Sequence, residues 1–140
     1  MTDADARRRF ASARVAHLAS VDASGRPHLV PITFVLAAEV IYTAVDDAKP
    51  KRTTALRRLA NIGANPAVSV LVDHYEEAWE ALWWVRADGR GRILESAAAE
   101  ARDALAALAG RYAPYRERTP PGPVIAIDVD RWVGWSASGE

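Results

Sequence analysis

The chain has 140 residues, and its 18 acidic residues balance its 18 basic residues to give a formal net charge of zero at pH 7. Half of the residues are apolar, which predicts one soluble globular domain over residues 1–140. Without a basic excess, nucleic acid is not an expected partner. The absence of cysteine excludes disulfides, thiolate catalysis and cysteine-ligated metal sites. No apolar run has the length of a membrane span or follows the pattern of a signal sequence, so we expect a cytoplasmic protein without a membrane partner.

The N-terminal part of the sequence predicts one helix followed by a meander of strands. The helix covers residues 2–13, and Thr2 and Asp5 form a capping pair at its start. A tight turn at Gly25 joins the first two strands. Pro31 removes a backbone N–H from the second strand, which therefore lies at a sheet edge, at a bulge or where another group approaches the backbone. The three strands are predicted over residues 15–21, 28–36 and 40–45.

The rest of the sequence alternates helices with strands. A second helix is predicted with Thr53 or Thr54 as its N-cap and with Asn65-Pro66 after its end. Asp88-Gly89 is interpreted as a hairpin turn, and Ser96 as the cap of a helix that runs to about residue 112. Four prolines predict an irregular segment over residues 113–123. Further strands are predicted over residues 67–72, 81–87, 90–94 and 124–129.

This order of elements predicts the fold class. Six or seven strands joined mainly by hairpins, with helices at the ends and corners, favour a mainly β fold, an antiparallel barrel that carries helices. A doubly wound α/β fold requires crossover helices between parallel strands, and the first three strands instead follow one another as a meander.

The loop before the second helix concentrates positive charge. Lys49 and Lys51 are the only lysines in the chain, and Arg52 follows them directly. A helix N-terminus carries orphan N–H groups and positive partial charge, so cations ahead of it favour a bound anion. Compact ammonium groups suit phosphate in particular. The loop is therefore predicted to bind an anion, and the alternative is a solvated surface loop.

Motifs for acid–base or metal chemistry are lacking. The sequence contains no nucleophile elbow, zinc-protease helix, Walker loop or dinucleotide-binding loop. The histidines have no metal-ligand spacing, so no metal site is expected. His17 lies mid-strand and is interpreted as structural, whereas His28, near an edge, is either structural or in contact with a site. His74 and the acidic residues from Asp73 to Glu80 are interpreted as a solvated segment.

Tryptophan is the more informative residue type. The chain has five tryptophans. Trp83 and Trp84 must point to opposite faces of a strand, so they cannot both fill one barrel interior. Five tryptophans exceed what the interior of a small barrel holds. We therefore expect some of them to line a subunit interface or a flat aromatic ligand.

Three segments together resemble a known superfamily. They are the strand–turn–strand unit over residues 15–34, with its Gly25-Arg26-Pro27 turn, the lysine loop 49–52, and the Asn-Pro strand over residues 65–73. Their order is similar to that of the split-barrel flavin and deazaflavin oxidoreductases, relatives of pyridoxamine 5'-phosphate oxidase, which have an FMN-binding split β-barrel. Within that superfamily the sequence most resembles small probable F420-dependent enzymes.

The resemblance implies a homodimer with two cofactor sites in grooves between the subunits. It implies coenzyme F420, a flat deazaflavin ring on a phosphate-bearing tail, as the cofactor and hydride transfer to a small organic substrate as the reaction. It assigns no catalytic side chain, because the cofactor carries the reaction. The residues that match the family's cofactor-binding positions are Lys49, Lys51, Arg52 and Thr53 for the phosphate region, Pro31, Ile32, Thr33, Thr43 and Ala44 for the ring, and Trp79 in the aromatic connector.

Two alternatives remain open at this point. The same fold binds FMN in place of F420 in some relatives, and a non-catalytic module would hold a phosphorylated or tetrapyrrole-like ligand. The C-terminal segment 132–135 lacks the substrate-binding arginine and histidine signatures of the pyridoxamine oxidases. Pyridoxal phosphate synthesis is therefore not the expected activity.

Overall fold

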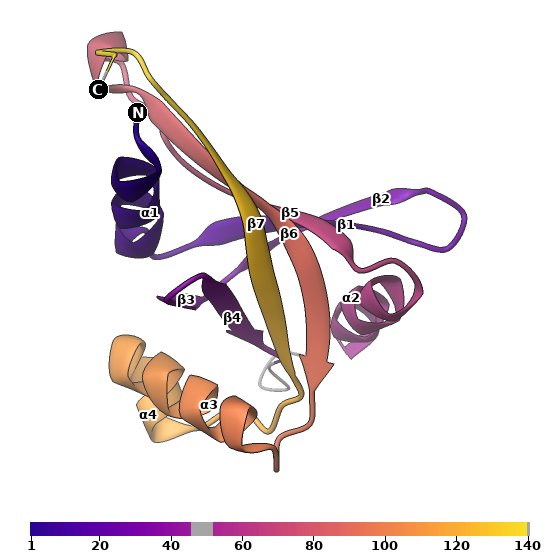
Figure 1. Ribbon diagram of the computed structural model, residues 1–140. Coiled ribbons are helices and arrows are strands. Elements are labelled where there is room, and N and C mark those ends of the chain that lie inside the picture. Colours follow the sequence, from indigo (N-terminus) through magenta and orange to yellow (C-terminus); the bar gives the residue numbers. More distant parts are fainter. Residues whose placement is uncertain (46–51, 140) are drawn as a thin grey trace.

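A computed structural model describes residues 1–45 and 52–139, without the side chains of residues 52–56 (Figure 1). The elements of this part of the chain are α1 (Asp3–Ser12), β1 (Ala16–Val21), β2 (Pro27–Ile32), β3 (Val35–Ala37), β4 (Val40–Ala44), α2 (Arg52–Ala64), β5 (Ala67–His74), the 3-10 turn η1 (Trp79–Ala81), β6 (Trp83–Leu94), α3 (Ala99–Arg111), α4 (Ala113–Glu117) and β7 (Val124–Ser136).

All strand pairs are antiparallel, and the sheet order is β2-β1-β5-β6-β7-β4-β3. The sheet curls into a half-barrel whose end strands, β2 and β3, do not pair with each other in the described residues. Figure 1 shows α2 beside the β1–β2 hairpin, and α3 with α4 across the end of the half-barrel. The predicted fold class, a mainly antiparallel split β-barrel with helices, is therefore confirmed.

The core lies on the concave face of this sheet. Phe10, fully buried on α1, places its ring centroid 4.9 Å from that of Phe34 and 5.2 Å from that of Trp132. Inward-facing residues of the central strands, such as Leu18 and Val70, complete the same cluster. A second buried cluster lies under α3 and α4. The side chains of α1 thus close one opening of the half-barrel.

The Asp88-Gly89 pair does not form the predicted hairpin turn. Strand β6 runs through it without interruption, and its register against β7 shifts between these two residues, as at a β-bulge. A Cβ atom on Gly89 would lie 2.2 Å from the carbonyl oxygen of Asp128. Glycine at this position therefore permits the two strands to approach closely, and Gly89 does not take the positive φ of a hairpin turn.

The prediction of a single strand over residues 28–36 is also wrong, because the strand is interrupted between β2, which ends at Ile32, and β3, which begins at Val35. At this interruption, the backbone N–H of Phe34 donates to Tyr112 Oη at 3.2 Å, and Arg111 Nη1 donates to the Phe34 carbonyl oxygen at 3.0 Å. The last residue of α3, Arg111, and the following residue, Tyr112, thus replace a neighbouring strand as hydrogen-bond partners. These long-range contacts cannot be derived from a local pattern.

Helix boundaries differ from the expectation in two places. Helix α1 has the predicted cap, since Thr2 Oγ1 accepts from the Asp5 N–H at 3.1 Å. Helix α2 begins at Arg52, so the two threonines predicted as its N-cap lie inside the helix. Helix α3 begins at Ala99, because Ser96 donates its hydroxyl to the Pro121 carbonyl and does not cap the helix.

Two C-terminal segments are more regular than expected. The proline-containing segment 113–123 includes the short helix α4 at its start. The last strand does not end near Val129, since β7 continues to Ser136 and pairs with β6 along its length.

Candidate functional site

The predicted phosphate-binding residues can be placed only in part. Lys49 and Lys51 lie outside the described residues. Arg52 and Thr53 form the start of α2, and the structure describes their backbone only. The predicted anion site at this helix entry therefore stays a prediction.

The predicted ring-binding segment Pro31–Thr33 lies at the end of β2. Pro31 is exposed and pairs with His17 of β1, while β2 is a terminal strand of the sheet, as the proline predicted. Ile32 is buried in the core, so only its backbone is available to a ligand. The Thr33 hydroxyl lies 2.7 Å from the hydroxyl of Tyr115 on α4.

The second ring-binding segment, Thr43 and Ala44, ends strand β4. Both side chains are buried, on opposite faces of the strand, and Ala44 belongs to the cluster under α3 and α4, so a ligand can use only the backbone of these residues. They pair with Ile125 and Val124 of β7 on one side. On the other side β3 pairs only with residues 40–42, so no described strand covers this edge of β4. Both predicted ring-binding segments therefore carry backbone edges that no strand covers.

Trp79 does not lie with these segments. It belongs to η1, is 72% exposed, and sits at the far end of the ribbon formed by β5, β6 and β7 (Figure 1). Of the predicted ring-binding strand ends, Thr43-Ala44 lies toward the opposite end of β6, because Ala44 pairs with Val124, which pairs with Leu94. Within one chain, the predicted set of site residues therefore does not come together in one place.

A groove of about 480 Å³ lies on the convex face of the sheet. It is lined by residues of β1, β2, β5 and β6, among them His17, Leu29, Leu71, Trp84 and Arg86, and by Tyr75 beyond β5. His17 lies mid-strand, as predicted, but it is exposed in this groove, which does not support its interpretation as a structural histidine. Arg86 Nε donates to Asp88 Oδ1 at 2.7 Å, and this hydrogen bond lowers the pKa of Asp88.

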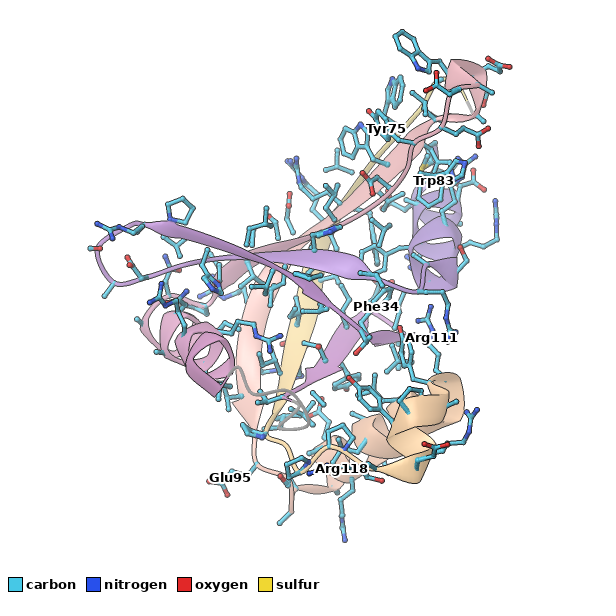
Figure 2. The ribbon with its side chains drawn as sticks, turned by 180° about the vertical axis from the view of Figure 1, so that it is seen from behind. Phe34, Tyr75, Trp83, Glu95, Arg111 and Arg118 are labelled. Atoms are coloured by element: carbon cyan, nitrogen blue, oxygen red, sulfur yellow. The ribbon has the colours of Figure 1, made fainter. Side chains whose placement is uncertain are left out.

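The neighbouring tryptophans lie on opposite faces of β6, as predicted. Trp84 lines the groove. Trp83 lies on the other face, where its ring is stacked against His74 at a centroid distance of 6.4 Å and the Arg9 guanidinium lies 5.5 Å from the centroid. Figure 2 shows Trp83 and Tyr75 in the outer part of the ribbon. The aromatic side chains of the groove are thus separate from those packed near α1.

A basic cluster on the covered side of the β1–β2 hairpin was not predicted as a unit. His28 of β2 is half-buried, and burial first, then the guanidinium groups of Arg57 and Arg58 on α2, lowers its pKa. Arg58 is also half-buried, and burial lowers its pKa. The adjacent arginines in the sequence were the available signal. Their proximity to His28 depends on how α2 docks.

The most strongly shifted carboxylate does not have the pKa of a general base at neutral pH. Hydrogen bonds from Arg92 and Tyr42 lower the pKa of Glu100 to about 2, and Arg92 also binds Asp128. The network joins α3 to strands β4, β6 and β7. The described residues also contain no group of three or more histidine, aspartate or glutamate side chains placed to hold a metal ion.

Comparison with known protein families shows to which family the chain belongs. The sequence profile named pyridoxamine 5'-phosphate oxidase matches residues 2–136. The chain belongs to this family. The match spans the whole half-barrel together with all four helices, so it covers each segment on which the resemblance was based. Curated proteins, by contrast, yield no match to the chain.

Solved structures of low sequence identity share the family fold. The conserved hypothetical protein Rv2991 of Mycobacterium tuberculosis is 19% identical with a TM-score of 0.77, over 98% of this chain and 86% of that one. A FAD-binding protein of Mesorhizobium loti is 20% identical with a TM-score of 0.73, over 96% and 94%. The heme storage protein HutZ of Vibrio cholerae is 18% identical with a TM-score of 0.73, over 96% and 93%. At these identities the comparison establishes the fold alone.

None of the described helices has the length and apolar character of a membrane-spanning segment.

Proposed function

We propose that this family member is an oxidoreductase that uses the deazaflavin coenzyme F420 for hydride transfer to a small organic substrate. The observation that carries the proposal is the uncovered backbone at the ends of β2 and β4, in the segments that the sequence resemblance assigns to the cofactor ring. Backbone N–H and C=O groups at a strand edge are ready hydrogen-bond partners for a planar polar ring.

The chain's own residues bind and orient the cofactor in this proposal. Pro31–Thr33 and Thr43-Ala44 hold the ring through their backbones, because the Ile32, Thr43 and Ala44 side chains are buried. Lys49, Lys51, Arg52 and Thr53 bind the phosphate at the entry of α2. When bound, the deazaflavin supplies the hydride chemistry. If the protein binds the cofactor and the cofactor carries out the reaction, no catalytic acid or base is required, and the sequence shows no recognisable one.

The convex sheet face supports the second part of the proposal, a homodimer. Leu29 is 67% exposed, Tyr75 65% and Trp135 43%, and the groove next to them is lined mainly by apolar side chains. Large apolar side chains gathered on one exposed face mark an interaction surface. We infer that a second copy of the chain covers this face.

The homodimer would also give Trp79 a role. Because η1 precedes Trp83 at the start of β6, Trp79 lies at the opposite end of that strand from the uncovered edge at Thr43-Ala44 of its own chain. In a dimer that packs through the convex face, the ribbon extends along the other subunit. Trp79 then contributes to the groove of the partner subunit, as the family resemblance implies.

Two kinds of structural neighbour support two further candidates. FAD-binding proteins of Mesorhizobium loti and Mycobacterium smegmatis share the fold, which favours a flavin such as FMN as the alternative cofactor. The heme storage protein HutZ favours a non-catalytic module for a tetrapyrrole. His17, exposed in an apolar groove, is the described histidine that such a module would use.

Oxidation of bound, reduced F420 by a panel of enones, quinones and biliverdin separates the enzyme from the binding module. The proposal predicts that at least one class of acceptor oxidises the cofactor faster with the protein than without it. Binding of heme with a Soret shift that His17→Ala abolishes, together with no acceleration by any acceptor, would establish the module instead.

A further inference from the structure

Two tyrosines at the junction of α3 and α4 contact the interruption between β2 and β3. Tyr112 is the residue between the two helices, and Pro114 fits the first turn of α4, where no N–H is needed. The backbone N–H of Tyr115 donates to the Tyr112 carbonyl oxygen at 3.0 Å. The two rings are buried and pack edge to face, with centroids 5.7 Å apart. Tyr112 and Tyr115 are called the tyrosine pair below.

Tyr112 holds the backbone of Phe34. Its hydroxyl oxygen accepts from the Phe34 N–H at 3.2 Å. The same hydroxyl donates to the carbonyl oxygen of Arg14 at 2.9 Å or of Phe34 at 3.1 Å. A hydroxyl has one donor and two acceptor sites, so this arrangement uses it in both senses. Because the Phe34 ring is fully buried, Phe34 is fixed through its side chain as well as its backbone.

Tyr115 holds the side chain of the preceding residue, Thr33. Their hydroxyl oxygens lie 2.7 Å apart. A threonine side chain has few staggered χ1 rotamers, and a hydrogen bond to a buried partner selects one of them. Tyr115 is only 9% exposed, whereas Thr33 is half-buried. Thr33 is therefore the member of this hydrogen bond that a ligand reaches.

We propose that the tyrosine pair positions the ring-binding segment of the cofactor site. Tyr115 acts through the side chain of Thr33, and Tyr112 acts through the backbone of Phe34. The inference rests on the proposed function, because Thr33 belongs to the segment that the resemblance assigns to the cofactor ring. A binding group that is already ordered loses less conformational freedom when the ligand arrives. The helical end of the half-barrel thus contributes to affinity through residues that do not themselves contact the ring.

NMR of the protein without cofactor tests whether the pair holds the segment. In the wild type, three-bond couplings should report one χ1 rotamer for Thr33. Tyr115→Phe removes only a hydroxyl, and the couplings should then indicate averaging between rotamers. Tyr112→Phe should accelerate hydrogen exchange at the Phe34 amide at least about tenfold, because that N–H loses its acceptor. A single Thr33 rotamer in Tyr115→Phe would overturn the role of Tyr115.

Tyr42→Phe is the matched control. Tyr42 Oη also makes a hydrogen bond of 2.7 Å to α3, where it donates to Glu100. Both variants lose one such bond, so a difference between them does not reflect general destabilisation. In fluorescence titrations with F420 and with FMN, Tyr115→Phe should weaken the binding of the cofactor that the wild type binds by about fivefold, the effect of one hydrogen bond. Tyr42→Phe should leave that affinity unchanged, and equal losses in the two variants would contradict the proposal.

A double variant shows whether Tyr115 acts through Thr33. In a Thr33→Val protein, which lacks the hydroxyl, Tyr115→Phe should cause no further loss of affinity. Thr33→Ser keeps the hydroxyl and should respond to Tyr115→Phe as the wild type does. Additive losses in the double variant would contradict the proposal. Failure of the wild type to bind either cofactor would refute the proposed function, whereas the Thr33 couplings would still decide whether Tyr115 holds this residue.

Discussion

Arg111 lies over the ring of Phe34, with its guanidinium carbon 4.8 Å from the ring centroid, and donates to the Phe34 carbonyl oxygen at 3.0 Å (Figure 2). The same side chain donates to the carbonyl oxygen of Ala13, at the end of α1. Arg111 thus joins α3 to both the α1–β1 connection and the break between β2 and β3. Thr33, in the proposed ring-binding segment, is the residue just before Phe34.

Substitution of Arg111 by methionine should destabilise the protein. The side chain's apolar stem is retained, but two backbone carbonyl groups lose a charged donor. We expect a loss of about 1–3 kcal/mol in the free energy of unfolding, measured by urea denaturation. Arg102→Met, at an exposed position on the same helix, should change stability by less than about 0.5 kcal/mol. Equal stability of the two variants would show that the Arg111 contacts are not stabilising.

Acid should lower the free energy of unfolding, because Glu100 becomes protonated. Arg92 and Tyr42 hold the pKa of Glu100 at about 2, below the ordinary glutamate value of 4.5. The folded state therefore binds fewer protons than the unfolded state between these values, and the contribution of this carboxylate is present above pH 4.5 and lost as pH falls toward 2. Because Glu100 is more than a third exposed, solvent screening reduces that contribution to about 1 kcal/mol.

Glu100→Gln tests this pH dependence. Urea denaturation at several pH values should show a shallower loss of stability between pH 4.5 and 2 for the variant than for the wild type. Glu117→Gln, at an exposed position on α4, should keep the wild-type slope. An unchanged acid slope in Glu100→Gln would mean that the Arg92–Glu100 pair does not persist in solution.

The proposed homodimer predicts the effect of a charge on the convex sheet face. Leu29 is 67% exposed, so Leu29→Asp should leave the fold intact by circular dichroism. The buried interface would then contain an unpaired carboxylate, and sedimentation equilibrium should show at least a tenfold weaker dimer. Ala106→Asp on the exposed side of α3 should leave association unchanged. A wild-type protein that sediments as a monomer would refute the homodimer directly.

Lys51 is predicted to bind the cofactor phosphate. Lys51→Ala should weaken F420 affinity by about 1–3 kcal/mol, the range for losing a charged hydrogen bond, with no change in the urea midpoint. Arg26→Ala, at an exposed position in the turn between β1 and β2, removes the same charge elsewhere and should have little effect. Unchanged affinity in Lys51→Ala would remove the lysine loop from the site.

Local patterns predicted the parts of the fold that depend on local chemistry. Pro31 lacks an N–H wherever it stands, so its place on an edge strand could be predicted from the sequence. The Asp88-Gly89 pair suits both a hairpin turn and a bulge. The close approach of the Asp128 carbonyl to Gly89 decides between them, and these residues are far apart in the sequence. The interruption between β2 and β3 at Phe34 likewise depends on Arg111, at the end of α3, and on Tyr112, the next residue.

Part of the candidate site could likewise be predicted from the sequence, and part could not. The resemblance to the family predicts which backbone segments bind the ring, and the structure places these segments at uncovered strand edges. The association of His28 with Arg58 could not be predicted, because it requires the docking of α2 on the hairpin through Asn61 and Ser20. The position of Trp79 could not be predicted either, since η1 lies at the opposite end of β6 from Thr43-Ala44, another segment predicted to bind the cofactor.

Fluorescence titration of the purified protein with F420 and, in parallel, with FMN tests the central claim most directly. F420 fluorescence should become polarised on addition of protein and saturate at one cofactor per chain, with FMN binding more weakly. Tight binding of FMN together with no binding of F420 would contradict the claim.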